Sequence, residues 1–362
     1  GTPLTADDVV ATYRAVLDAA RASPHRASLA NVVGITAVDA RTVDFALAAP
    51  DPLFPGLLVI GVMPARDAAL ERPPHPLGSG PFAVADVAPR RISLQRVHDA
   101  QPVLIDVIEN ETTRALKLAR GELDLVPGGF APEVAHWLAR QPGLALVERD
   151  GTTFSYLGFN FAQGPTAVAA VREAISAAID REAIVRHVFR GQARPAAAIL
   201  VPTHWAGAPT LTVPAHDPAH ARRLLAALGH DREHPLRISY KTSSDQFRLR
   251  IATILQAQLR EVGIALDIRS YDWGTFYADI KAGRFGYAFH SASVPPAGAN
   301  RGRYASAAVD ALVARAERAG DLAERAALYR EIQALLLRDL AYAPLWYEQQ
   351  VFVRRARVIG YD

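Results

Sequence analysis

The serines set beside small or polar residues are the first candidates for catalytic chemistry. Ser79 lies between two glycines, and Ser243 precedes a second serine. A hydrolase nucleophile of the α/β type needs Gly-x-Ser-x-Gly between a strand and a helix, and neither segment has that spacing. Gly128 and its neighbouring glycine likewise lack the spacing of a phosphate-binding loop or a dinucleotide fingerprint. The sequence therefore disfavours a hydrolase.

The histidines are the second candidates, because imidazoles at helical spacing bind metal ions. His216 and His220 are four residues apart, but the sequence between them predicts that a helix begins after His216, so the two do not share a face. His230 and His234 lie in a polar loop, where solvated side chains are the simpler interpretation. We expect neither a metal site nor a cofactor.

Aromatic residues at a strand end give the strongest indication of binding. Tyr271 and Trp273 follow a predicted strand directly. Aromatic side chains offer a large contact area, and Tyr and Trp add a polar group. Core packing would explain either residue alone, but their place at a strand-to-helix turn favours a ligand site.

The elements around these aromatics form the most regular part of the chain. Residues 236–289 alternate as strand, helix, strand, helix and strand, and glycines close both helices. This βαβαβ order predicts a parallel sheet with helices on its faces. Ligands of such sheets bind at the carboxyl ends of the strands, which here are residues 241–244, 270–273 and 290–293.

The rest of the chain predicts an α+β part and a return to it. Thr5 and Asp8 mark a helix start, and two hairpins follow at residues 33–47 and 82–97. Later helices are predicted to begin near Asp180, Asp217 and Asp321. Residues 343–353 read as a last strand that resembles this early part in composition. Two crossovers between domains, with a cleft between them, are therefore expected.

Composition limits the class of protein further. The 362 residues carry 40 basic and 37 acidic side chains and no cysteine. The small net charge gives no reason to expect nucleic acid as a partner, and no apolar run approaches the roughly 20 residues of a spanning helix. The absence of cysteine suits an exported protein. The chain opens directly on a structured element, as though sequence before it were missing.

Several motifs in order resemble the family 5 extracellular solute-binding proteins of ABC importers, the dipeptide, oligopeptide and nickel-binding group. No single motif is decisive, but their order spans the whole chain. The matching segments include a glycine-rich turn at residues 76–82, a strand at 156–161 and helices at 171–182. The other matching segments are residues 1–9, 121–124, 217–225, 300–304, 325–333 and 343–345.

The resemblance implies an α/β fold like that of periplasmic binding proteins, with two lobes joined by a hinge. The first lobe would comprise residues 1–155 and 344–362, and the second residues 156–343. The implied function is capture of a small polar solute, peptide-like by family, and delivery to an ABC permease of the inner membrane. A periplasmic monomer that is not an enzyme is expected. A sensor domain of a transcription regulator is the alternative.

The residues expected to line the cleft are aromatic, polar or cationic, with one glycine. The family also has β-structure before the first helix, and a longer loop between His290 and Asn300 that often carries a carboxylate, neither of which this sequence shows. Either this loop is absent, or it was disordered and is not included in the sequence; if it is absent, peptide binding through that carboxylate is not expected. The predicted ligand-binding residues are Phe159, Asn160, Tyr271, Trp273, His290, Arg301, Trp205 and Gly80.

Overall fold

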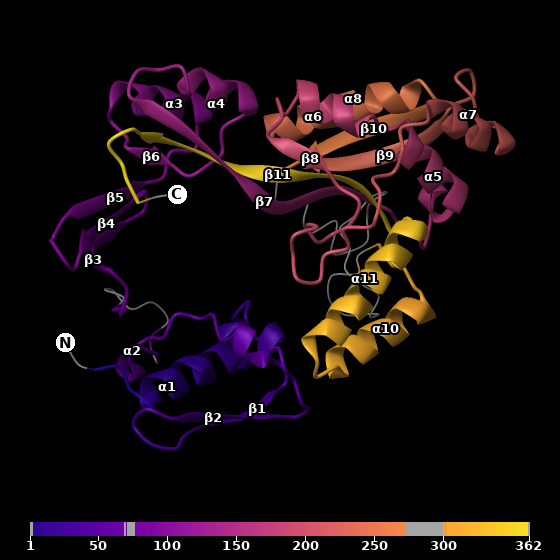
Figure 1. Cartoon of the computed structure of the whole chain (residues 1–362). Helices are drawn as coiled ribbons and strands as arrows, with labels where there is room; N and C mark the ends of the chain where they lie inside the picture. Colours follow the sequence, from indigo (N-terminus) through magenta and orange to yellow (C-terminus); the bar gives the residue numbers. More distant parts are fainter. Residues whose placement is uncertain are drawn as a thin grey trace. The chain divides into compact units, whose positions relative to one another are not determined.

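The structure is a computed structural model that describes residues 3–68, 70, 77–272, 275, 300 and 302–360. The chain divides into two compact units, Gly1–Asn110 and Glu111–Asp362, each of which is described here by itself (Figure 1). Within the described residues, no helix combines the length and the apolar character needed to cross a membrane.

Unit 1 contains a helix packed on a hairpin and a separate three-stranded sheet. The helix α1 buries Val10 and Tyr13 against Ile35 of the hairpin and against Phe54, in one small core. The second hairpin gains a third strand that the sequence analysis did not predict, and all three strands pair antiparallel. The elements are α1 (Ala6–Leu17), β1 (Val32–Ala37), β2 (Val43–Leu47), α2 (Ala65–Ala68), β3 (Phe82–Ala88), β4 (Arg91–Arg96) and β5 (Pro102–Asp106).

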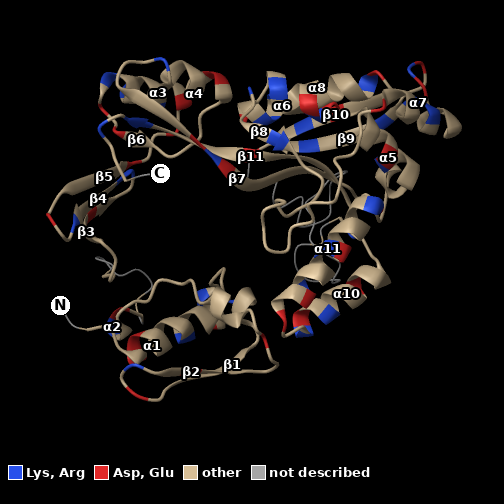
Figure 2. Ribbon diagram, in the orientation of Figure 1, with Lys and Arg blue, Asp and Glu red and all other residues tan. Residues whose placement is uncertain are grey.

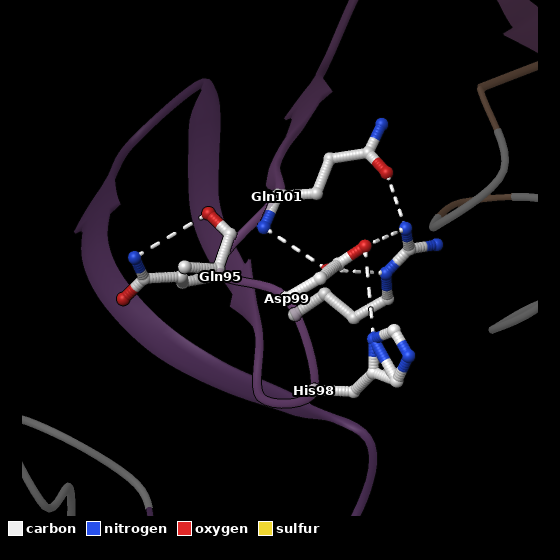
Figure 3. A network of polar contacts seen from close by, with 6 residues as sticks. Gln95, His98, Asp99 and Gln101 are labelled. Carbon is white, nitrogen blue, oxygen red and sulfur yellow. Dashed lines mark hydrogen bonds and ion pairs between the residues drawn. The ribbon is translucent and has the colours of Figure 1, made fainter.

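A polar network fixes the turn between β4 and β5 (Figure 3). Arg96 Nε donates to Asp99 Oδ1 at 2.8 Å, and the same guanidinium contacts Gln101. The Gln101 amide donates to Asp99 Oδ1 at 3.2 Å. Hydrogen bonding from Arg96 lowers the pKa of Asp99 to about 2. Arg96 and Asp99 thus form an ion pair within the turn.

The start of α1 confirms the predicted capping residues. Asp8 Oδ2 accepts from the Thr5 amide at 2.9 Å, and Asp8 Oδ1 accepts from the Ala65 amide at 2.7 Å. The carboxylate therefore caps α1 and also ties it to α2. These two backbone hydrogen bonds lower the pKa of Asp8.

We expect Asp8→Asn to destabilise unit 1 by about 1 kcal/mol, because asparagine has a single acceptor oxygen and one of the two backbone N–H groups would then face an NH2 group that cannot accept a hydrogen bond. The folded-state pKa lies below the unfolded one, so this stabilisation is present above the unfolded value near 3.8 and is lost as pH falls through the folded value. Urea unfolding at pH 7 and pH 3 measures both effects. An equal loss of stability at the two pH values would contradict this role.

Unit 2 is built around two long antiparallel strands, β7 and β11, which pair along most of their length. Strand β11 also pairs with β6 and β8, and β9 pairs in parallel with β10. The elements are α3 (Glu111–Arg120), β6 (Leu125–Val126), α4 (Pro132–Leu138), β7 (Leu144–Gly158), α5 (Ala169–Ala178), α6 (Arg181–His187), β8 (Ala193–Pro195), α7 (Pro218–Ala227), β9 (Leu236–Ser243), α8 (Gln246–Arg260), β10 (Ile264–Tyr271), α10 (Ala307–Arg318), α11 (Leu322–Arg338) and β11 (Tyr342–Arg355).

Separate cores occupy the two ends of the β7–β11 pair. Leu146 of β7 and Val353 of β11 belong to a core with α3, α4 and β6. Leu157 of β7 and Trp346 of β11 belong to a larger core with α5, α6, α8, β9 and β10. We call residues 111–150 and 350–360 the small half of unit 2, and residues 152–349 the large half. The chain passes between them only within β7 and β11, as Figure 1 shows.

Most predicted helix starts and strands of unit 2 are confirmed. Asp180, Asp217 and Asp321 are N-caps whose carboxylates accept backbone N–H groups of α6, α7 and α11. The predicted strand–helix–strand order holds for β9, α8 and β10. The next predicted helix and strand, at 276–289, lie outside the described residues. The sequence analysis missed α4 and the first half of β7.

Candidate functional site

The carboxyl ends of β9 and β10 lie side by side, as the βαβ pattern predicted. Ser270 pairs with Thr242, and Tyr271 pairs with Ser243. The Ser244 amide then donates to the Tyr271 carbonyl at 2.8 Å. This arrangement produces the strand edge at which parallel sheets bind ligands. We call residues 241–244 and 270–272 the strand edge.

Lys241 and Tyr271 are partly exposed side chains of the strand edge that lie next to each other. Lys241 Nζ lies 5.2 Å from the centre of the Tyr271 ring, within the range of a cation–π contact. A cation beside an aromatic face can bind an anionic group while the ring contacts the apolar part of the same ligand. The sequence analysis placed Lys241 at this strand end but did not count it among the ligand residues.

A partly buried ion pair ties the loop next to the strand edge to β11. Arg248 on the first turn of α8 donates to Glu348 of β11 at 2.7 and 3.3 Å, and Ser155 Oγ of β7 donates to Glu348 at 2.6 Å. Burial alone would lower the pKa of Arg248, but Glu348 outweighs it, and the pKa lies above its ordinary value. Asp245 caps α8 by accepting from the Arg248 amide at 2.9 Å. The loop after β9 is thus tied to the β7–β11 pair.

Phe159 and Asn160, two other predicted ligand residues, are buried and are not part of the strand edge. The Phe159 ring is fully buried (0% exposed) in the large core, so it stabilises that core and offers no surface to a ligand here. Asn160 is 3% exposed, and its side-chain oxygen accepts from the Ala162 amide at 2.9 Å, which makes it a loop-forming residue. The sequence could not tell which face of this β-prone run points inward.

Trp205 and Gly80 belong to other parts of the chain than the strand edge. Trp205 is 40% exposed on a loop held by α11, where Arg330 Nη2 donates to its carbonyl at 3.1 Å. Gly80 belongs to unit 1, in open space before β3. Trp273, His290 and Arg301 lie outside the described residues, so their predicted roles stay predictions.

A cavity of about 850 Å³ lies elsewhere in the large half, between α5, the start of α7 and the end of α11. Most of its charged groups are engaged within the fold: His220 Nε2 lies 2.7 Å from Glu173, and Asp339 accepts from the Tyr304 hydroxyl and from Arg338. Arg172 donates to the Thr166 and Ala167 carbonyls, although its Nε has no hydrogen-bond partner among the described residues. Burial and Asp339 raise the pKa of Tyr304 to about 12, so the hydroxyl remains a donor. The strand edge is therefore the better candidate for ligand binding.

Charge and metal chemistry give no competing site among the described residues. Groups of three or more His, Asp or Glu suited to a metal ion are absent from the described part of the chain. Figure 2 shows positive and negative residues interspersed over the elements of unit 2. This distribution agrees with the near-balanced composition of 40 basic and 37 acidic residues.

Comparison with known families decides the class of protein. The family model for bacterial extracellular solute-binding proteins, family 5 Middle, matches residues 1–307. The chain belongs to this family. This assignment confirms the resemblance found in the sequence. The members of family 5 are solute-binding proteins rather than enzymes.

Curated family 5 relatives are binding proteins of ABC transport. The chain is 28% identical to the probable ABC transporter periplasmic-binding protein SapA of Escherichia coli, over 94% of this chain and 71% of SapA. It is 27% identical to the periplasmic oligopeptide-binding protein OppA of E. coli, over 100% of this chain and 76% of OppA. Against the nickel-binding protein NikA of Staphylococcus aureus, identity is 28% over 79% of this chain and 62% of NikA. The transcription-regulator alternative gains no support from these relatives.

Solved family 5 structures confirm the periplasmic-binding-protein fold. The substrate-binding protein CtaP of Listeria monocytogenes matches with a TM-score of 0.86 at 24% identity, covering 99% of this chain and 80% of that one. DppA of Helicobacter pylori in complex with the peptide STSA matches with a TM-score of 0.81 at 23% identity, covering 100% and 79%. The mixed α/β architecture with several sheets is thus the fold that the sequence predicted.

Proposed function

We propose that this family 5 protein captures a small polar solute, peptide or peptide-like, at the strand edge and delivers it to an ABC permease of the inner membrane. The pairing of Lys241 with Tyr271 at the carboxyl ends of β9 and β10 carries the proposal. A peptide presents an anionic carboxylate and apolar side chains, which suit a lysine and an aromatic ring. The protein acts in the periplasm, as a monomer and without catalysis.

The two proposed lobes meet where the chain crosses between the halves of unit 2. The sequence predicted boundaries at residues 155 and 344, and the change of core supports crossing points a few residues away, at Gly151 and Gln349. A two-stranded connection permits rotation of one half against the other, which is how hinged binding proteins close on ligand. The sites proposed for Trp273, His290 and Arg301 would belong to the large half.

Calorimetry against a defined panel tests the proposal. The panel contains di-, tri- and oligopeptides, with and without a C-terminal amide, and also glutathione, haem and nickel–histidine, because relatives carry those names. We expect saturable binding of peptides and a thermal shift on binding. Binding of nickel or haem alone would overturn the peptide assignment, and silence across the panel from folded protein would overturn the binding site.

We expect Lys241→Gln to weaken binding of peptides with a free carboxylate about tenfold, because a charge-assisted hydrogen bond is lost. Amidated peptides should bind the variant and the parent equally. Lys117→Gln is the matched control, since Lys117 pairs with Glu122 at 2.6 Å on α3, in the small half. Equal weakening for both kinds of peptide would show that Lys241 does not contact the carboxylate.

A further inference from the structure

The β7–β11 pair is irregular where the chain crosses between the halves. An added Cβ at Gly151 would lie 2.0 Å from the Glu348 carbonyl oxygen, so the strands approach closely there. The register shifts between Glu348 and Gln350, and the intervening Gln349 amide donates to the Gln192 carbonyl at 3.1 Å instead. Such a bulge locally disrupts the ladder and bends the strand. Rotation between the halves is therefore most easily absorbed at this position.

Among the described residues, one ion pair joins the halves without involving β7 or β11. A second, between Arg194 of β8 and Asp150 of β7, spans 3.5 Å and involves β7 itself. In the first, Arg250 of α8, in the large half, donates to Glu133 of α4, in the small half, at 2.6 and 3.2 Å. The bidentate geometry requires the two helices to hold a defined separation and orientation. Both side chains are partly exposed, so the pair can form and break without burying a lone charge.

The same turn of α8 also meets the strand edge and the hinge strands. The helix begins at Gln246, directly after the loop that closes the carboxyl end of β9. Arg248 binds Glu348 at the bulge, and Arg250, two residues on, binds the opposite half. The pair therefore lies at the edge of the sheet where the solute is proposed to bind.

We propose that Glu133 and Arg250 form a latch that stabilises the present arrangement of the two halves and thereby tunes solute affinity, an inference that rests on the proposed binding function. An interaction made in only one arrangement shifts the equilibrium toward it. A partly exposed ion pair changes such an equilibrium about two- to fivefold. That is enough to bias the equilibrium and small enough to be overcome when the solute binds or leaves.

Spin-label distances test the latch without any ligand. The chain has no cysteine, so Ala139→Cys in the small half and Ala257→Cys in the large half give a labelled pair without background. Pulsed electron–electron double resonance then measures the distance between the two spin labels, one in each half. In Glu133→Gln and in Arg250→Gln we expect a second distance population to grow two- to fivefold, and 1 M salt should do the same to the parent.

A charge reversal and a matched control complete the design. The double variant Glu133→Arg with Arg250→Glu should restore the parent distribution. Arg232→Gln removes another ion pair, Arg232 with Glu261 at 2.7 Å, that lies wholly within the large half, and should leave the distances unchanged.

Identical distributions in the parent and both neutral variants would overturn the latch, as would an equal shift in Arg232→Gln. Because these distances are measured without solute, failure of the latch is distinguishable from failure of the binding function, which the calorimetric panel tests.

Discussion

Arg181→Ala is expected to destabilise unit 2 by roughly 3 kcal/mol or more. Arg181 is 2% exposed, and its Nε donates to the Pro344 carbonyl at 2.6 Å. Its other nitrogens donate to the Ser176 carbonyl and hydroxyl, both at 3.0 Å. The side chain thereby fastens the end of α5 to the start of β11. Alanine would leave buried carbonyls without donors and a cavity beside them.

Burial lowers the pKa of Arg181 to about 10, so the guanidinium is still charged at neutral pH. Carbonyl dipoles and a hydroxyl stabilise this charge, and their planar arrangement suits arginine better than lysine. Arg181→Lys should therefore lie between the parent and the alanine variant. Arg186→Ala is the control, because that side chain is 67% exposed and its ion pair with Glu182 is long at 3.8 Å. Urea unfolding followed by circular dichroism measures all three, and equal effects of the two alanine variants would refute the assignment.

Gly151→Ala is expected to cost about 3 kcal/mol, at the upper end of overpacking effects. The new Cβ would meet backbone atoms, with Glu348 O at 2.0 Å and Gln350 N at 3.2 Å, and backbone cannot rotate away as a side chain can. The strands would have to separate at the crossing between the halves. We therefore expect lower stability together with an altered distance between them.

The control for this substitution is Gly320→Ala, at a loop position where no atom lies within 4 Å of the added Cβ. Its stability should stay within about 0.5 kcal/mol of the parent. Thermal unfolding of both variants, with the spin-label pair described above, separates loss of stability from loss of hinge geometry. A Gly151→Ala protein as stable as the parent would mean that the bulge relaxes easily.

The features that could be predicted from sequence are those set by local chemistry. An aspartate before a proline or at the head of an apolar stripe commonly begins a helix. The helix starts predicted at Asp217 and Asp321 are both confirmed. The βαβ order similarly brought Tyr271 to a strand end. Helix α4 was missed because its seven residues are held by the small core and carry no N-cap side chain.

The features that could not be predicted depend on residues far apart in the chain. Arg248 and Glu348 are 100 positions apart, and Glu133 and Arg250 are 117 apart, so no spacing rule connects them. Phe159 is predicted to line the cleft, but an aromatic residue in a β-prone run can face either side of the strand, and the sequence does not show which. Its 0% exposure was decided by helices that pack on it later in the chain.

Strand β11 has a consequence for the order of folding. It follows every other described element of the chain, yet it contributes Val353 to the small core and Trp346 to the large one. Its contacts span long loops, such as the 193 positions between Ser155 and Glu348. During synthesis, neither core can close until this last strand has emerged. Both halves of unit 2 therefore reach their native packing in the same step, after β11 has been synthesised.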